Sequence, residues 1–279
     1  MGSAMTPRLV AAGFAVLGWD LSVDRRNKLA ATQGSRPASS AAEVFGQCSR
    51  VILSLPDSAV VRQVVRDASP SLSSGQILID TSTGDPATAV ELAAELQQRA
   101  VAYLDATISG SSAQVAEGAA VFMVGGAPAA FEHCTDLFAC LGARTFHTGD
   151  SGTGAKMKLA TNLVLGLNRA ALAEGLAFAA ALGLEAALAL AILRGSLAYS
   201  RIMDTKGEKM LTGDFTPQAR LSQHLKDVRL MLAATELKLP LSEAHRRLLE
   251  QAEAQGWGGL DNSAIIRTYE APPTPRQSP

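Results

Sequence analysis

Short apolar runs alternate with helical stretches over the first part of the chain, and this alternation constrains the fold most strongly. The apolar runs lie at residues 14–19, 51–55, 77–80, 101–104 and 121–124. Helices are expected at residues 2–12, 24–32, 58–66, 86–98 and 128–141, with an extended segment at 144–147. Strands and helices that alternate in this way form a parallel sheet with helices on both faces. The sequence therefore predicts an α/β domain over residues 1–150.

The pattern changes after residue 149, where the short apolar runs stop. Alanine- and leucine-rich stretches at 151–182, 185–195, 217–236 and 241–255 have helical character. We expect an all-helical second domain over residues 151–270, which begins with a long, largely apolar and therefore buried helix. Residues 271–279 are rich in proline, and we expect them to be disordered.

Composition excludes several classes of function. The 279 residues are 47% hydrophobic and carry a formal net charge of −1, which gives no electrostatic preference for nucleic acid. The cysteines and histidines show neither metal-ligand spacing nor a disulfide framework. Asn168, Arg169 and Glu174 interrupt the longest apolar stretch, which argues against a membrane span. With no signal-peptide pattern at the start, we expect a cytoplasmic protein without a metal site.

Candidate site residues follow from the expected topology. Ligands of parallel α/β sheets bind beyond the carboxyl ends of the strands. Those ends carry Asp20, Leu55 with Pro56, Ser82 with Thr83, and residues 105–111.

A second candidate site lies at the start of the long helix. Gly152 and Gly154 allow a tight turn, and Lys158 and Asn162 follow with a spacing of four residues. On a helix this spacing places both side chains on one face. A buried lysine gives up its proton more readily than an exposed one, and an amide beside it can hold a substrate hydroxyl. The pair is a candidate for proton transfer, although such pairs are often solvated.

Taken together, six segments resemble the β-hydroxyacid dehydrogenase family, which includes 3-hydroxyisobutyrate dehydrogenase and tartronate semialdehyde reductase. The segments are residues 1–5, 55–57, 80–86, 105–111, 152–162 and 226–227. The resemblance implies a Rossmann-type domain followed by a helical domain, with the active site between them. It also implies hydride transfer between NAD(P) and a small β-hydroxy acid or its semialdehyde. Lys158 would transfer the proton, Asn162 would orient the substrate, and Lys226 would reach both cofactor and substrate.

The resemblance assigns cofactor contacts to the first domain. Gly2 corresponds to the third glycine of the cofactor loop. Asp20 lies eighteen residues later, where a carboxylate binds the ribose hydroxyls and favours NAD over NADP. Arg25 and Arg26 keep NADP open as an alternative. Leu55 and Pro56 would lie beside the adenosine or pyrophosphate, and Thr83 would contact the nicotinamide half.

The substrate carboxylate would bind to Ser109, Gly110 and Ser111, whose hydroxyls and accessible backbone N–H groups suit an anion. Three positions depart from the family signatures. Thr107 replaces a proline and Ser111 a glycine, which we expect to affect the choice of acid. Thr161 replaces the first of two asparagines, while the second, Asn162, is retained.

The family begins with a strand and a Gly-x-Gly-x-x-Gly loop, whereas this sequence begins where the third glycine stands. We expect an upstream segment in the natural protein, because a missing strand would expose two strand edges. One alternative is a silent binding or scaffold protein without a competent cofactor site. Another is an imine reductase on the same fold. We also expect a homodimer or homotetramer formed through the helical domain.

Overall fold

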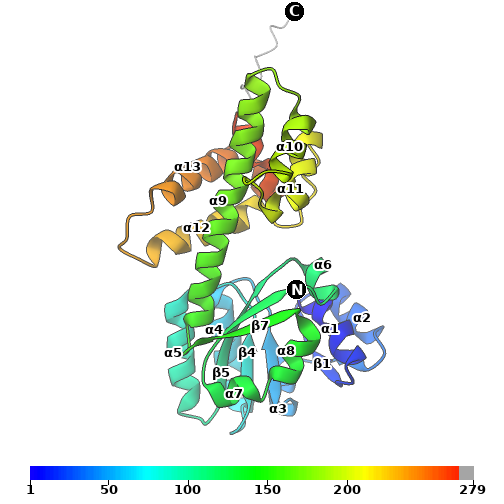
Figure 1. Cartoon of the computed structure of the whole chain (residues 1–279). Coiled ribbons are helices and arrows are strands. Elements are labelled where there is room, and N and C mark those ends of the chain that lie inside the picture. The colour runs from blue at the N-terminus through cyan, green and yellow to red at the C-terminus, as the bar shows by residue number, and fades with distance from the viewer. Residues whose placement is uncertain (270–279) are drawn as a thin grey trace, which may run out of the picture. The chain divides into compact units, whose positions relative to one another are not determined.

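The computed structural model in Figure 1 describes residues 1–269, and the expected disorder of 271–279 lies outside them. The chain divides into two compact units. The first, Met1–Lys158, contains all the strands of the described residues and is called the α/β unit here. The second begins at Leu159 and is called the helical unit.

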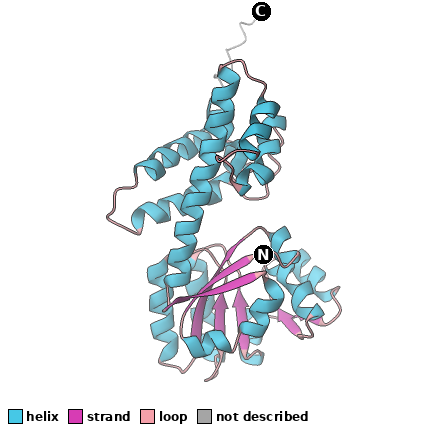
Figure 2. Ribbon diagram, in the orientation of Figure 1, coloured by secondary structure: helices cyan, strands magenta, loops and turns pink. Residues whose placement is uncertain are grey.

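Five strands form the main sheet of the α/β unit, in the order β3-β4-β5-β6-β7. They are β3 (Arg50–Leu53), β4 (Ile77–Asp80), β5 (Ala102–Ser109), β6 (Val121–Gly125) and β7 (Arg144–Gly149). Figure 2 shows this sheet among its helices, which confirms the Rossmann-like α/β fold. One detail of the prediction was wrong, because β6 runs antiparallel to β5 while the other pairs are parallel.

The antiparallel pairing also changes the length of β5. The sequence predicts a strand that ends at residue 104, with Asp105 just beyond it. In the structure, residues Asp105–Ser109 continue the strand because β6 pairs with them residue by residue. Asp105 is therefore a buried residue within the strand, 3% exposed, and only Ser109 lies at the strand end.

Two further strands, β1 (Val16–Gly18) and β2 (Ser35–Pro37), form a separate parallel pair. No hydrogen-bonded ladder joins this pair to the five-stranded sheet. A strand was expected over residues 14–19, and β1 lies within this range. Its expected burial was wrong, since all of β1 is only half-buried. β2 was not predicted, because its residues form no apolar run.

Eight α-helices accompany the strands of the α/β unit within the described residues. They are α1 (Gly2–Ala11), α2 (Val23–Ala30), α3 (Ala41–Gln47), α4 (Ser58–Ala68), α5 (Pro86–Gln97), α6 (Ser112–Ala116), α7 (Pro128–Glu132) and α8 (Thr135–Leu141), with a 3₁₀ turn at Ser69–Ser71. The single helix expected over 128–141 is interrupted at His133 and Cys134. Successive residues of β4 point to opposite faces, so Ile77 and Ile79 enter one hydrophobic core while Leu78 enters another.

The helical unit contains five α-helices within the described residues. They are α9 (Thr153–Ala181), whose first turns belong to the α/β unit, α10 (Ala186–Arg194), α11 (Arg201–Thr212), α12 (Leu221–Ala233) and α13 (Pro240–Ala254). Two 3₁₀ segments, Trp257–Gly259 and Asn262–Tyr269, complete the unit. The sequence predicted all these α-helices except α11, whose many polar residues concealed its apolar side.

A buried ion pair ties α11 to the end of the helical unit. Lys206 Nζ lies 2.9 Å from Asp261 Oδ1, and both side chains are almost fully buried. Burial would raise the pKa of Asp261, but hydrogen bonds from Lys206, Gln218 and Ser263 lower it to about 2. The pair keeps its charges because each one is satisfied locally.

One helix within residues 1–269, α9, is long and apolar enough to cross a membrane by length and composition alone. This is weak evidence for a span, because buried core helices meet the same criteria. Its apolar side packs in the hydrophobic core of the helical unit through Leu172 and Leu176, which are each 2% exposed.

Candidate active site

The turns that follow β3 and β4 are joined by side-chain hydrogen bonds. Leu55 N donates to Ser82 Oγ at 2.9 Å, and Asp85 N donates to Ser58 Oγ at 2.7 Å. These bonds hold the two turns with the candidates Leu55, Pro56 and Thr83 next to each other. Leu55 and Thr83 are half-buried and Pro56 is exposed, so all three are accessible at the carboxyl edge of the sheet.

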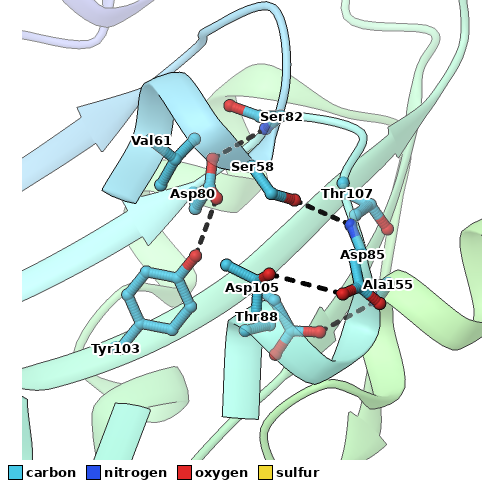
Figure 3. Close-up of a pocket in the computed structure, with 12 residues that line it drawn as sticks. Ser58, Val61, Asp80, Ser82, Asp85, Thr88, Tyr103, Asp105, Thr107 and Ala155 are labelled. Carbon is cyan, nitrogen blue, oxygen red and sulfur yellow. Dashed lines mark hydrogen bonds between the residues drawn. The ribbon is translucent and has the colours of Figure 1, made fainter. Parts of the chain in front are cut away.

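Asp80 fixes the beginning of the second turn from inside the unit. Its carboxylate accepts hydrogen bonds from Tyr103 Oη at 2.7 Å and from Ser82 N at 2.9 Å (Figure 3). Burial raises the pKa of Asp80 and that of Tyr103. The side chain is only 8% exposed, so we assign it a structural role beneath the turn.

The candidate adenosine side is formed by α1 and the segment after β1. Met1 precedes α1 and makes no side-chain capping bond, so the start of this helix offers backbone N–H groups to an anion. Asp20 accepts a hydrogen bond from Ser22 N at 2.8 Å and pairs with Arg25 at 3.1 Å. Arg26 lies 4.4 Å over the ring of Trp19. A carboxylate and two guanidinium groups therefore meet here, a combination compatible with both NAD and NADP.

The candidate substrate segment begins where β5 ends. Gly110 adopts φ +149°, and a Cβ there would lie 3.2 Å from the Cβ of Ala120, which explains the glycine. Ser111 caps α6, because its Oγ accepts a hydrogen bond from Gln114 N at 3.3 Å. The glycine usual at this position could not form that cap. Thr107 is 1% exposed, so it acts inside the unit and not as a surface for substrate.

Lys158 and Asn162 lie on α9, and both are largely buried, at 9% and 7% exposure. Asn162 Nδ2 donates to Asp227 Oδ2 at 3.0 Å. Asp227 Oδ1 also lies 4.0 Å from Lys226 Nζ. Because a carboxylate only accepts hydrogen bonds, this contact turns the amide nitrogen of Asn162 toward Asp227 and leaves the amide oxygen for another partner.

The structure therefore joins Asn162, Lys226 and Asp227 into one cluster in the helical unit. Lys158 belongs to the α/β unit, together with the candidates on the strand ends. From the sequence, Asp227 was included only as part of the segment 226–227, and its bond to Asn162 was not predicted. A carboxylate next to a candidate lysine was the available signal, but sequence spacing cannot show which helix it faces.

Comparison with known sequence families decides the class of this protein. Residues 1–149 match the NAD-binding domain of 6-phosphogluconate dehydrogenase. Residues 152–269 match the domain described as NAD-binding of NADP-dependent 3-hydroxyisobutyrate dehydrogenase. The chain belongs to the β-hydroxyacid dehydrogenase family. It is an NAD(P)-dependent oxidoreductase, and the cofactor is NAD or NADP.

Individual relatives agree with this assignment over nearly the whole chain. Glyoxylate/succinic semialdehyde reductase 1 of Arabidopsis thaliana is 31% identical, covering 97% of this chain and 95% of its own. The 2-(hydroxymethyl)glutarate dehydrogenase of Eubacterium barkeri is 29% identical, with coverages of 97% and 92%. The structure of Mycobacterium tuberculosis 3-hydroxyisobutyrate dehydrogenase with L-serine superimposes with a TM-score of 0.88 at 28% identity, covering 97% and 96%. A dehydrogenase of hydroxy acids fits these relatives better than an imine reductase or a scaffold protein.

Proposed function

We propose that this family member oxidises a small β-hydroxy acid of the 3-hydroxyisobutyrate type or reduces the corresponding semialdehyde. The observation that carries the proposal is the buried Lys158, followed one turn later by an asparagine held by Asp227. Burial of a lysine favours its neutral form, which is the form that accepts a proton. A fixed amide next to it supplies the polar contact that orients a hydroxyl or carboxylate.

In the oxidative direction, Lys158 accepts the proton of the substrate hydroxyl at its Nζ. In the reductive direction, the Lys158 ammonium returns that proton to the carbonyl oxygen. Asn162 orients the substrate through the amide oxygen that its bond to Asp227 leaves available. Ser109, Gly110, Ser111 and Lys226 bind the substrate carboxylate.

Cofactor binding is assigned to Gly2, Asp20, Leu55, Pro56, Thr83 and Lys226. When bound, NAD(P) supplies or accepts the hydride. The uncapped start of α1 suits the pyrophosphate. The Asp20 carboxylate suits the ribose hydroxyls and favours NAD. The Arg25 guanidinium, once released from its ion pair with Asp20, can bind the 2′-phosphate of NADP. The two joined turns support Leu55 and Thr83 at the strand ends.

The compounds named for the relatives narrow the class of substrate that we propose. Their names specify semialdehydes and a branched hydroxy dicarboxylate, and the M. tuberculosis enzyme was solved with L-serine. All three compounds or classes are small and carry a carboxylate. L-serine is itself a β-hydroxy acid. The hydroxyl of 2-(hydroxymethyl)glutarate also lies on the carbon β to a carboxylate. We therefore place the substrate among β-hydroxy acids and the semialdehydes derived from them.

Assembly and location complete the proposal. Many exposed apolar side chains lie on the helical unit, including Val164, Leu165, Phe178, Leu188 and Ile192. Apolar exposure on this scale is typical of a protein–protein interface, and we propose a homodimer or homotetramer formed through this unit. We propose the cytoplasm as the location, since Cys48, Cys134 and Cys140 are all free thiols.

The first test is fluorescence titration of the 279-residue chain with NADH and NADPH, followed by turnover assays. The substrate panel contains 3-hydroxyisobutyrate, L-serine, glycerate and 2-(hydroxymethyl)glutarate with NAD⁺ and NADP⁺, and tartronate semialdehyde with NADH and NADPH. We expect micromolar NADH binding and turnover of at least one panel compound. Cofactor binding without turnover would contradict the substrate class, whereas absence of both would contradict the proposed enzyme.

A further inference from the structure

The first turn of α9 is fixed to strand β5 by two buried side chains. Asp105 Oδ1 accepts a hydrogen bond from Gly152 N, and its Oδ2 accepts one from Ala155 N, each at 2.8 Å. Thr107 donates its hydroxyl to the backbone O of Gly154, also at 2.8 Å. All five residues belong to the α/β unit. We call these three hydrogen bonds the helix clamp.

The clamp brings two backbones so close that only glycine fits between them. A Cβ on Gly154 would collide with the backbone O of Asp105, and one on Gly125 would lie 2.6 Å from Asp105 Oδ1. A side chain at either position would push α9 away from the sheet. The glycines and the clamp therefore select one register between helix and strand.

The same strand leads directly to the candidate substrate segment. Alternate residues of a strand face the same side, so Asp105, Thr107 and Ser109 form one row with about 7 Å between successive members. The first two residues hold α9, and the third begins the segment that would bind the carboxylate. On the helix, Lys158 follows Ala155 by three residues, about 4.5 Å further along the axis and on a neighbouring position.

The electrostatics of the clamp suit an anchoring carboxylate. Burial raises the pKa of Asp105, whereas the N–H groups of Gly152 and Ala155 favour the ionised form. The start of a helix carries partial positive charge, which also stabilises an anion. Since both carboxylate oxygens already have backbone donors, Asp105 is engaged as an anchor and is not itself presented as an acid or base.

We propose that Asp105 and Thr107 are positioning residues for the reaction at Lys158, an inference that rests on the proposed function. The clamp sets the axial position and rotation of Lys158 relative to Ser109 on the same strand. Displacement of a reacting group by about 1 Å can cost about 100-fold in rate. Thr107 stands where the family signature has proline, so this chain holds its helix with a hydroxyl that proline lacks.

The decisive variant is Thr107→Val, which keeps the shape of the side chain and removes the hydroxyl. We expect kcat to fall about 5- to 50-fold, while the KM for the acid and the Kd for NADH change less than twofold. Thr107→Ser restores the hydroxyl and most of kcat.

The matched control is Thr268→Val, which removes a hydrogen bond of 2.8 Å from the Thr268 hydroxyl to Ile265 O in the helical unit and leaves kcat unchanged. A wild-type value of kcat in Thr107→Val would overturn the positioning role. The role would also be overturned if kcat fell only in proportion to the fraction of protein that still binds NADH, since misfolding would then explain the loss.

Hydrogen–deuterium exchange tests the clamp without relying on activity. We expect the amides of residues 152–158 to exchange at least tenfold faster in Thr107→Val and in Asp105→Asn, but not in Thr268→Val. Unchanged exchange in both clamp variants would refute the clamp.

The experiments distinguish failure of the proposed function from failure of the positioning role. If the wild-type protein turns over no acid, the proposed function fails and the positioning role fails with it, while hydrogen exchange still reports on the clamp. If the wild-type protein is active and Thr107→Val is normal, only the positioning role fails.

Discussion

Two lysines near the start of α9 provide an internal comparison at the scale of the residue. Lys158 is 9% exposed, whereas Lys156 is exposed to solvent. Residues two positions apart on a helix face different directions, so only one of them can serve the site that Lys158 faces. Proton transfer from a positioned side chain contributes about 10²- to 10⁴-fold to a rate.

We therefore predict that Lys158→Met lowers kcat by about 10²- to 10⁴-fold in both directions of the reaction. The Kd for NADH, measured by fluorescence, stays within about threefold of the wild-type value. Lys156→Met has the same chemical change and leaves kcat within about twofold. Equal losses in the two variants would show that the lysine assignment is wrong.

A second prediction concerns Asp20 and the preference for NADH over NADPH. Its carboxylate pairs with Arg25 at 3.1 Å. Asp20→Asn removes the charge that repels a 2′-phosphate and releases the Arg25 guanidinium to bind one. We expect the ratio of the Kd for NADPH to the Kd for NADH to fall at least tenfold.

The control for this change is Asp24→Asn, which removes the same charge from the exposed side of α2. It should alter the ratio less than twofold, since long-range charge effects are screened by salt. A similar shift in both variants would indicate a general charge effect and would contradict a specific contact of Asp20.

At the scale of the element, a buried basic cluster joins α9, α12 and α13. Arg169 on α9 is 1% exposed, and the rings of His224 and His245 lie 5.1 Å apart. Both rings approach the backbone of α9 at Gly166, where a Cβ would lie 2.5 Å from His224 Nε2. Burial, with a further effect of the Arg169 charge, lowers the pKa of His245 to about 4.

This pKa predicts a loss of stability in mild acid. His245 binds a proton near pH 6.5 when unfolded but only near pH 4 when folded, so its contribution to stability is present above pH 6.5 and is lost as the pH falls toward 4. Between pH 7.5 and pH 5.0 this amounts to about 2 kcal/mol. We expect the free energy of unfolding of the helical unit to fall by about this amount.

Urea unfolding in a Trp19→Phe background measures this loss, because Trp257 in the helical unit then provides the fluorescence. His245→Leu should remove most of the difference between the two pH values. His133→Gln, which replaces an exposed histidine of the α/β unit, should leave it unchanged. An unchanged pH dependence in His245→Leu would contradict the assignment to this side chain.

At the scale of the whole molecule, the exposed apolar side chains of the helical unit predict self-association. Leu188 and Ile192 lie one turn apart on α10 and are 55% and 60% exposed. We expect sedimentation velocity to give at least twice the chain mass of 29.0 kDa. Leu188→Lys with Ile192→Lys should shift the distribution toward the monomer, because a buried unpaired charge opposes association.

The control for the assembly is Leu241→Lys, a change at an exposed leucine of α13. It should leave the sedimentation coefficient unchanged if the interface involves α10. A wild-type monomer at micromolar concentration would refute the proposed oligomer, and an effect of Leu241→Lys alone would move the interface to another helix.

The sequence by itself determined the types of most elements and their order. Apolar periodicity located β3, β4, β6 and the helices α4, α5, α9, α10, α12 and α13, because burial of a strand or helix face leaves a local pattern. The family and its cofactor class also followed from short segments, since glycine turns and strand ends carry the same chemistry in related chains. The candidates Lys158 and Asn162 were visible as a helical pair.

Only the tertiary structure decided which distant side chains meet. The antiparallel pairing of β6 extended β5 and buried Asp105, which had been expected beyond the strand end. The contacts of Asp105 with Gly152 and of Asn162 with Asp227 span long sequence separations. Such contacts depend on how helices and strands pack, and no local periodicity records them. The sequence therefore supplied the residues for the chemistry, and packing decided which of them are held in place and by which partners.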